Sequence, residues 1–366
     1  MKKTSSILFV TLALLPLISY GQGNLINVPS LRIEPDPIST GRGMTGVAQA
    51  DQGQALYWNP AGLAYQKGWQ FKGTRFNYLP GLNDLSYNYV SVQKDIDNWS
   101  TLGGHITYLD LGSQVGQDPQ GNPTGDISSH EVAIGISYGR IAIPNTLTLG
   151  LGLRYTSSKL TSNGQFADSL SAKTGHAISF DIGMFYEPGE WSIGSVPVIP
   201  TIGASITNFG GRMEYSDSGF KNPLPTLLRV GIENTLLLDK YAINTLAISV
   251  EISKYMVRVD STGAKGPFKS LFSSWGSYEY YNGKEDISVG LGKQLMYGIG
   301  LEYWYNNLLA VRGGYYSESQ ANGGSKYLTT GMSVRFSYLQ LNASFALPQN
   351  STEIDNYFRL GINLRF

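Results

Sequence analysis

The sequence predicts an all-β protein, a 14-stranded antiparallel transmembrane β-barrel of the outer-membrane type with an N-terminal plug segment. The last ten residues, 357–366, read YFRLGINLRF, so apolar and polar residues alternate and the chain ends on Phe366. Stretches with the same alternation recur along the chain, and the connections between them alternate in length. A period of two puts lipid-facing and lumen-facing side chains on opposite faces of a strand.

The composition fits a membrane barrel and excludes several other classes. The chain has 44 Gly, 24 Tyr and 15% charged residues, which suits closely spaced strands and aromatic girdles. Its formal net charge of zero provides no electrostatic basis for binding nucleic acid. The absence of Cys excludes a disulfide framework, thiolate catalysis and a Cys-based zinc site. We expect no cofactor.

The N-terminus predicts a signal peptide followed by a hatch. Within residues 1–21, a basic start precedes an apolar run and the small residues that a signal peptidase requires. This apolar run is too short to span a bilayer comfortably, and no later stretch approaches the ~20 uninterrupted apolar residues of a transmembrane helix. Residues 22–66 do not alternate, and their prolines and glycines favour turns. We expect them to fold compactly in the barrel mouth or lumen; an open linker is the alternative.

Residues 67–366 form the predicted barrel. We place its strands at 69–78, 84–93, 100–111, 130–141, 147–158, 176–187, 199–209, 226–238, 244–256, 295–305, 308–317, 327–336, 338–347 and 357–366. The connections after even-numbered strands are mostly short, and those after odd-numbered strands are mostly long. Short periplasmic turns alternating with long outside loops are typical of bacterial barrels. The even count predicts that both termini are periplasmic.

The strand faces opposite the apolar ones carry charges of both signs. These are Arg154, Asp181, Arg229, Glu233, Glu251, Glu302, Arg312, Arg335, Arg359 and Arg365. Burying such groups singly is costly, so we expect a network of ion pairs and hydrogen bonds in the lumen. A substrate-conducting path is the alternative.

Two glycine motifs do not support cofactor binding or catalysis. Residues 41–46 match G-x-G-x-x-G but lack the preceding strand that a dinucleotide site requires. Residues 135–139 match G-x-S-x-G but lie inside an alternating strand, not at a strand-to-helix turn. The three histidines are scattered along the chain. We therefore expect no enzymatic activity and a structural role for Ser137.

The longest connection, residues 257–294, contains a predicted amphipathic helix in GPFKSLFSSW, residues 266–275. A helix would gather four apolar side chains on one face: Phe268, Leu271, Phe272 and Trp275. Pro267 suits the first helical turn. Strand parity places this helix outside the membrane. Its apolar face either packs on the rim of the barrel or docks on a partner, so these four are candidate partner-binding residues.

Two resemblances add to this interpretation. Asn59, Pro60 and Ala61, within YWNPAGLAY, resemble the N-terminal hatch motif of the FadL-like long-chain fatty acid transporter family, whose barrels have fourteen strands. The wider run LRIEPDPISTGRGMTGVAQADQGQALYWNPAGLAY resembles the opening of the PorV family of type IX secretion outer-membrane proteins. The similarity continues in LGLGLRYTSSKL, LPTLLRVGIENTLLLDKY and IGLEYWYNNLLAVRGGYYSES, and the loop at 257–294 departs from it.

The resemblance implies protein transport. PorV-like proteins bind the C-terminal domain of secreted cargo, receive it at the SprA-type translocon and pass it to the PorU-type sortase, or attachment, complex. The expected partners are these proteins and outer-membrane lipids, and the expected location is the outer membrane. A channel for hydrophobic compounds and a lipopolysaccharide O-deacylase are the alternatives. An apolar tunnel would favour the first, and a serine Oγ placed near a histidine would favour the second.

Overall fold

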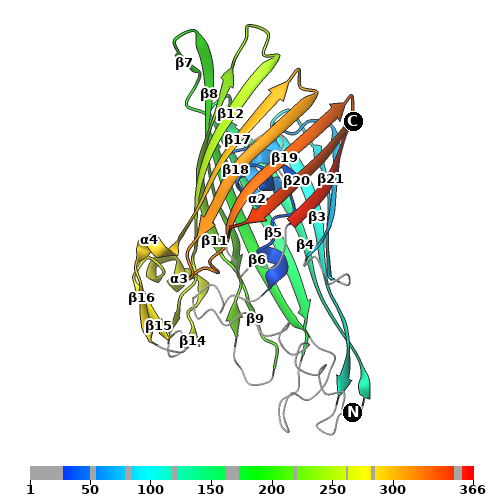
Figure 1. Cartoon of the computed structure of the whole chain (residues 1–366), viewed down its shortest axis with the longest axis vertical. Helices are drawn as coiled ribbons and strands as arrows, with labels where there is room; N and C mark the ends of the chain where they lie inside the picture. Colours follow the sequence, from blue (N-terminus) through cyan, green and yellow to red (C-terminus); the bar gives the residue numbers. More distant parts are fainter. Residues whose placement is uncertain are drawn as a thin grey trace, which may run out of the picture.

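The computed structural model describes residues 28–49, 55–78, 85–117, 123–160, 173–216, 221–260, 263–281, 285–349 and 357–366, which build a closed β-barrel (Figure 1). Each barrel strand pairs antiparallel with its neighbours, and β8 pairs with β11 to complete the ring. The strands are β1 (Trp69–Asn77), β2 (Leu85–Asp95), β3 (Ser100–Gln117), β4 (Pro123–Ile143), β5 (Leu147–Lys159), β6 (Gly175–Tyr186), β8 (Val196–Gly210), β11 (Leu227–Leu237), β12 (Asn244–Tyr255), β17 (Leu295–Tyr305), β18 (Leu309–Glu318), β19 (Lys326–Phe336), β20 (Leu339–Pro348) and β21 (Tyr357–Arg365). The predicted 14-stranded antiparallel barrel is confirmed.

The β3–β4 hairpin is longer than predicted. The sequence places a connection at 112–129, but β3 continues to Gln117 and β4 begins at Pro123. Pairing resumes after a register irregularity between Asp110 and Ser113. A strand pair can continue beyond the membrane because its backbone groups already satisfy one another. The apolar alternation is not needed there, which is why the sequence pattern ends earlier than the strands.

The two ends of the barrel differ in their connections. The turn end carries the short connections 96–99, 144–146, 238–243, 306–308 and 337–338, together with β7 (Trp191–Ile193), which pairs only with β8. The loop end carries the small elements β9 (Arg212–Met213), β10 (Asn222–Pro223), β13 (Val259–Asp260), β14 (Gly263–Ala264), α3 (Pro267–Ser273), β15 (Tyr278–Tyr281), β16 (Asp286–Val289) and α4 (Leu291–Gln294). This asymmetry agrees with the predicted parity of turns and loops.

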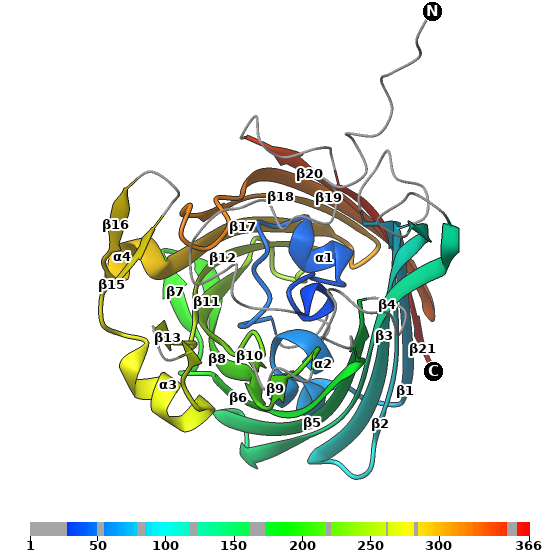
Figure 2. The ribbon, with the colours of Figure 1, turned by 90° about the horizontal axis from the view of Figure 1, so that it is seen from below.

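Residues 28–49 and 55–66 lie inside the ring of strands when the barrel is viewed along its axis (Figure 2). They include η2 (Pro29–Leu31), α1 (Pro37–Thr40), α2 (Ala55–Trp58) and η3 (Pro60–Tyr65). Helix α1 contacts β19, β20 and β21, whereas η3 contacts β3 to β6 on another part of the wall. Asp36 caps α1 by accepting hydrogen bonds from the backbone N of Ile38 and Ser39 at 2.9 and 3.2 Å.

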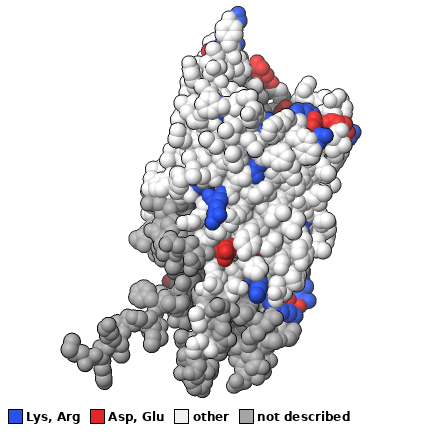
Figure 3. Space-filling view, turned by 90° about the vertical axis from the view of Figure 1, so that its right-hand side faces the viewer, with Lys and Arg blue, Asp and Glu red and all other residues white. Residues whose placement is uncertain are grey.

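Side chains alternate strictly between the two faces of the wall. Along β6, buried and exposed residues alternate at every position. The outward residues of β5 include Leu149, Leu151 and Leu153, which are 46–60% exposed. One side of the wall is correspondingly mostly uncharged between its ends, with a few isolated charged side chains (Figure 3). Among the described residues, no helix is long and apolar enough to cross a bilayer.

The C-terminal strand joins the two ends of the barrel sheet, because β21 pairs with β1. Phe366 exchanges two backbone hydrogen bonds with Trp69, at 2.8 and 3.0 Å. Its ring lies 5.6 Å from that of Tyr338 and 6.3 Å from that of Phe71. Residue 366 therefore holds the closing seam at the turn end.

Deleting Phe366 is expected to lower the amount of folded barrel several-fold, because it removes both seam hydrogen bonds and both ring contacts. The measurement is the membrane-integrated fraction whose gel mobility changes on heating. Phe336→Ala removes an exposed ring at the turn end without touching the seam and serves as the control. A normal level of heat-modifiable barrel after deletion of Phe366 would contradict the predicted assembly role.

Candidate functional site

The predicted hatch motif forms a turn against the barrel wall. The Asn59 side chain caps η3 by accepting a hydrogen bond from Ala61 N at 3.2 Å. Its Nδ2 donates to the carbonyl of Val47 at 2.9 Å and to the carbonyl of Met184, in β6, at 3.0 Å. One amide therefore joins two parts of the interior segment to the wall.

Glycines in the wall allow this close approach. A Cβ on Gly183 would lie 1.9 Å from Asn59 Oδ1, and one on Gly150 would lie 2.2 Å from Ala61 N. These two glycines are register partners on β6 and β5. Any side chain there would displace the turn. The sequence analysis did not identify this cradle; glycines at lumen-facing positions of alternating strands are the signal that could have revealed it.

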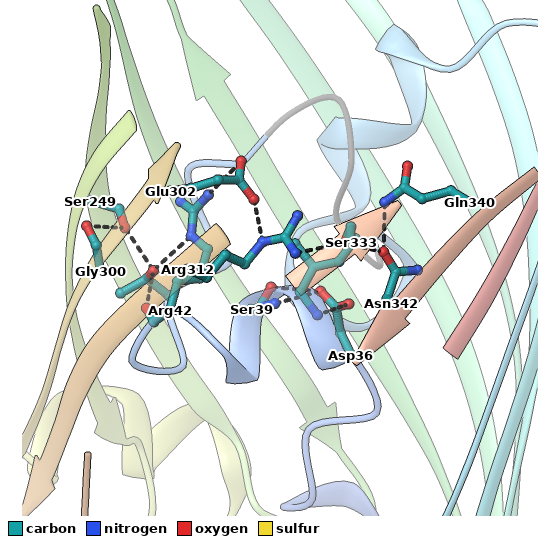
Figure 4. Close-up of polar contacts among 12 residues, drawn as sticks. Asp36, Ser39, Arg42, Ser249, Gly300, Glu302, Arg312, Ser333, Gln340 and Asn342 are labelled. Atoms are coloured by element: carbon teal, nitrogen blue, oxygen red, sulfur yellow. Dashed lines mark hydrogen bonds and ion pairs between the residues drawn. The ribbon is translucent and has the colours of Figure 1, made fainter. Parts of the chain in front are cut away.

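A cluster of buried charges fixes the turn around Arg42 (Figure 4). The Arg42 guanidinium bonds to Glu233 of β11, and its Nη1 lies 3.5 Å from Glu302 Oε1 of β17. Arg312 of β18 bonds to the same Glu302 and donates to Ser333 Oγ at 2.6 Å. Two positive and two negative groups thus meet with little exposure to solvent, so their charges compensate one another.

A second buried pair holds the segment after this turn. Glu251 Oε2 of β12 accepts hydrogen bonds from the backbone N of Gly46 and Val47 at 2.8 and 2.9 Å. Its other oxygen lies 3.7 Å from Arg229 Nε. The Arg229 guanidinium in turn lies 4.7 Å from the ring centre of Trp58. Wall charges therefore bind the backbone and an aromatic ring of the interior segment.

The described part of the interior leaves little free space. The better formed of the pockets lined by described residues has a cavity volume of about 10 Å³, enough for one water molecule. A second pocket, between the turn at 42–48 and the wall, has a cavity volume of about 0 Å³. Neither of these two pockets has the volume of a ligand-sized apolar tunnel.

Helix α3 lies on the outer side of the wall at the loop end (Figure 2). Phe272 is 81% exposed, Phe268 71% and Trp275 45%; Leu271 is half-buried. The predicted helix is therefore present, with all four candidate residues on or next to it. Two of these rings touch the barrel: Phe268 makes a 5.0 Å edge-to-face contact with Phe209, and the ring of Trp275 lies 5.4 Å from Lys254 Nζ of β12.

The polar side of α3 attaches it to the wall. Ser270 and Ser274 are buried, with exposed fractions of 3% and 1%. Lys254, on the outward face of β12, donates a 2.8 Å hydrogen bond to the carbonyl of Ser274. A positive charge at the C-terminal end of a helix also interacts favourably with the helix dipole. The amphipathic helix therefore lies with its apolar face directed away from the barrel. The first alternative, in which that face packs on the rim of the barrel, would need the opposite orientation.

Ser137 occupies the lumen face of β4 and is 3% exposed. His105, on the neighbouring β3, stacks on Tyr89 with ring centres 5.7 Å apart. No hydrogen bond joins Ser137 to a histidine in the described parts of the chain, and no group of three potential metal ligands occurs there. The arrangement lacks the contact between nucleophile and base that acyl transfer needs.

Ser137→Ala is expected to leave secretion and lipid A acylation unchanged, because the side chain has only a packing role in a mid-strand position. Mass spectrometry of lipid A from cells carrying the variant is the measurement. Ser344→Ala, at a similarly buried lumen position of β20, is the matched control. Loss of a deacylated lipid A species in the Ser137 variant alone would overturn the structural assignment.

The comparisons with known proteins agree on a barrel class. The chain is similar to the toluene transporter TbuX of Ralstonia pickettii, with 17% identity over 91% of this chain and 98% of that chain and a TM-score of 0.51. It also matches the toluene transporter TodX of Pseudomonas putida at 15% identity, covering 90% and 97% of the chains, with a TM-score of 0.49. A FadL homologue of Pseudomonas aeruginosa matches at 10% identity, covering 91% and 99%, with a TM-score of 0.48. No curated protein matches the chain.

The likeness to TbuX shows the fold: this chain has the β-barrel fold of that transporter. A family model described as "Type IX secretion system protein PorV" matches residues 22–262, well over half of the chain. The chain belongs to the PorV family of type IX secretion system proteins. The predicted resemblance to the PorV family is confirmed, and barrel and family together indicate an outer-membrane component of that system.

Proposed function

We propose that this chain carries cargo in the type IX secretion system. In this proposal it binds the C-terminal targeting domain of secreted cargo at the SprA-type translocon and brings it to the PorU-type attachment complex. The exposed apolar face of α3 is the observation that carries the proposal. An apolar face held outward by buried polar contacts suits binding to another protein, and exposed aromatic side chains are frequent binding anchors.

We infer that the turn end faces the periplasm and the loop end faces the cell surface. The short connections at one end and the elaborated loops at the other support this orientation. The C-terminus lies at the turn end (Figure 1), so it would be periplasmic; the predicted periplasmic position of the N-terminus falls on residues outside the described part of the chain. The predicted signal peptide, residues 1–21, lies outside the described residues.

The interior segment acts as a hatch in this proposal, so that the barrel binds cargo rather than conducting a ligand. Support comes from the buried ion pairs around Arg42 and from the close contact of Asn59 with the wall. The alternative, a channel for hydrophobic compounds, would need a passage of ligand size, and neither of the two pockets described above has that volume. We likewise assign no catalytic role to Ser137, since no hydrogen bond joins it to a histidine in the described chain.

The orientation can be tested by labelling, because the chain has no native Cys. Lys269→Cys places a thiol on exposed α3, and Lys240→Cys places one in an exposed turn-end connection. A membrane-impermeant maleimide added to intact cells is expected to label the first and to label the second only after lysis. Labelling of Lys240→Cys in intact cells would reverse the inferred orientation.

The cargo-carrier function is tested by affinity purification of the tagged chain from secreting cells. We expect the translocon, the attachment complex and cargo C-terminal domains among the recovered proteins. An unrelated outer-membrane barrel with the same tag is the control. Recovery of none of these three above that control would reject the proposed function.

A further inference from the structure

The outward wall of the barrel has a polar sector on β1 and β2. Arg75 and Asn77 of β1 are exposed on the outward face, whereas Gln70, Lys72 and Thr74 point into the lumen. Asn88 and Ser86 of β2 are the register partners of Arg75 and Asn77. We call these four outward residues the polar notch: Arg75, Asn77, Ser86 and Asn88.

Next to the polar notch, the belt of outward-facing apolar side chains is shorter than elsewhere on the barrel. On the outward face of β2, only Val90 and Val92 separate Asn88 from Lys94. On β6, by contrast, the outward positions between 178 and 186 are all apolar or aromatic. Two outward residues correspond to four residues of strand, or ~13 Å at a rise of ~3.3 Å per residue. The apolar band of a membrane barrel is usually ~25 Å tall, so the apolar stretch on β2 is about half as long, even without allowing for strand tilt.

Arg75 lies within the part of the wall that faces lipid. It is six residues from Trp69 at the turn end, which corresponds to ~15 Å across the membrane on a strand tilted by ~40°. Its register partner on β21 is Leu360, whose exposed fraction is 53%. Figure 3 shows this side of the barrel, where isolated charged spots interrupt an otherwise uncharged belt. An arginine facing lipid at this depth is costly unless an anion reaches it.

We propose that the polar notch binds a phosphate group of a lipid A-type glycolipid. The Arg75 guanidinium offers the planar set of donors that binds phosphate, and no ion pair within the described chain occupies it. Asn88 Nδ2 donates to Ser86 Oγ at 3.2 Å, so the Ser86 hydroxyl hydrogen is left to donate to a ligand. The notch contains three neutral polar side chains beside one cation, which favours an anion.

The neighbouring carboxylate does not neutralise this charge. Asp110 of β3 faces Ser86 in register, and its Oδ1 accepts a 3.0 Å hydrogen bond from the backbone N of Gly112. On the same register row, Asn88 faces Tyr108, whose ring stacks on His130 as expected at a membrane interface. Arg75 is two strands away from Tyr108 along that row.

The choice of a lipid A phosphate rests on the proposed orientation, in which the leaflet at the loop end is the outer one. The apolar belt is narrow over β1 and β2, and a bilayer thins locally over a short apolar wall. Thinning brings the phosphates of that leaflet toward the notch. A phosphorylated glycolipid bound there would hold one defined side of the barrel against the outer leaflet.

The test uses the full-length barrel in detergent, analysed by native mass spectrometry with added lipid A. We expect Arg75→Gln to weaken lipid A binding about tenfold or more, as expected for loss of a charge-assisted contact, and Arg75→Lys to retain part of it. Arg140→Gln removes another exposed outward arginine, near the turn end, and is expected to bind as the parent does. Heat-modifiable mobility confirms that each variant is folded.

Two comparisons decide the identity of the ligand. Lipid A stripped of its phosphates is expected to bind the parent as weakly as intact lipid A binds Arg75→Gln. Equal binding of intact and stripped lipid A would overturn the proposal, as would equal binding by parent and Arg75→Gln. Phosphatidylglycerol that competes as well as lipid A would overturn the choice of lipid. Because this assay contains no secretion component, its failure leaves the cargo-carrier proposal standing, and rejection of that proposal leaves the lipid result standing.

Discussion

Replacing Phe272 and Trp275 together by serine is expected to abolish partner capture and cargo secretion while the barrel stays folded. Burial of a large apolar side chain contributes about 1.5–3 kcal/mol, so the two changes together remove about 3–6 kcal/mol from an interface that buries both. That loss corresponds to a ~100- to 10,000-fold weaker complex, which would eliminate a micromolar contact.

The barrel should tolerate this double change because α3 is attached by other groups. The buried Ser270 and Ser274 and the Lys254 hydrogen bond are retained in the variant. The ring of Trp275 lies 5.4 Å from Lys254 Nζ, and loss of this cation–π contact costs only about 0.5–1 kcal/mol at an exposed site.

The measurement compares the proteins recovered with the tagged variant and the cargo released by cells that produce it at the parent level. Tyr241→Ser is the matched control, because Tyr241 is 77% exposed but lies at the turn end. Parent-level cargo capture by an abundant double variant would refute the docking role of α3 and leave its apolar face to contact outer-leaflet lipid.

The alternation of side chains was enough to predict the wall of the barrel. In a closed barrel each lumen-facing position is flanked by outward ones, so a single strand such as 357–366 already shows both faces. The amphipathic character of α3 was also predictable, because its four apolar residues have the spacing that places side chains on one face of a helix: Phe268, Leu271, Phe272 and Trp275. Its orientation was not, since it depends on Lys254, which is distant in sequence and caps the helix from β12.

The interior contacts were predicted only in part. Glu233, Glu302 and Arg312 can be recognised in the sequence because they are charged residues on the lumen-facing side of alternating strands. Arg42 lies in a segment with no periodicity and gave no comparable signal. Its pairing partners are 191 and 260 residues away along the chain (233 − 42 and 302 − 42). Which strand faces which part of the interior segment depends on the closure of the ring, and no local pattern records it.

Arg42→Met is expected to destabilise the interior segment strongly, since it leaves Glu233 buried without its cation and removes one of the two partners of Glu302. Removing one member of a buried ion pair typically costs about 3–5 kcal/mol, whereas replacing a whole pair by uncharged groups is often nearly neutral. The thermal midpoint of the purified barrel should therefore fall in Arg42→Met. If the segment closes the lumen, planar bilayers should show conductance that the parent lacks.

The double variant Arg42→Met with Glu233→Gln separates charge imbalance from a mere change of shape. In the double variant the cluster again contains equal numbers of positive and negative groups, because the ion pair of Arg312 and Glu302 remains. We therefore expect most of the lost thermal midpoint to be recovered and most of the conductance to disappear. A double variant no better than Arg42→Met would mean that the arginine acts through packing alone. An Arg42→Met barrel with parent stability and no conductance would contradict the assignment of this cluster as the interior lock.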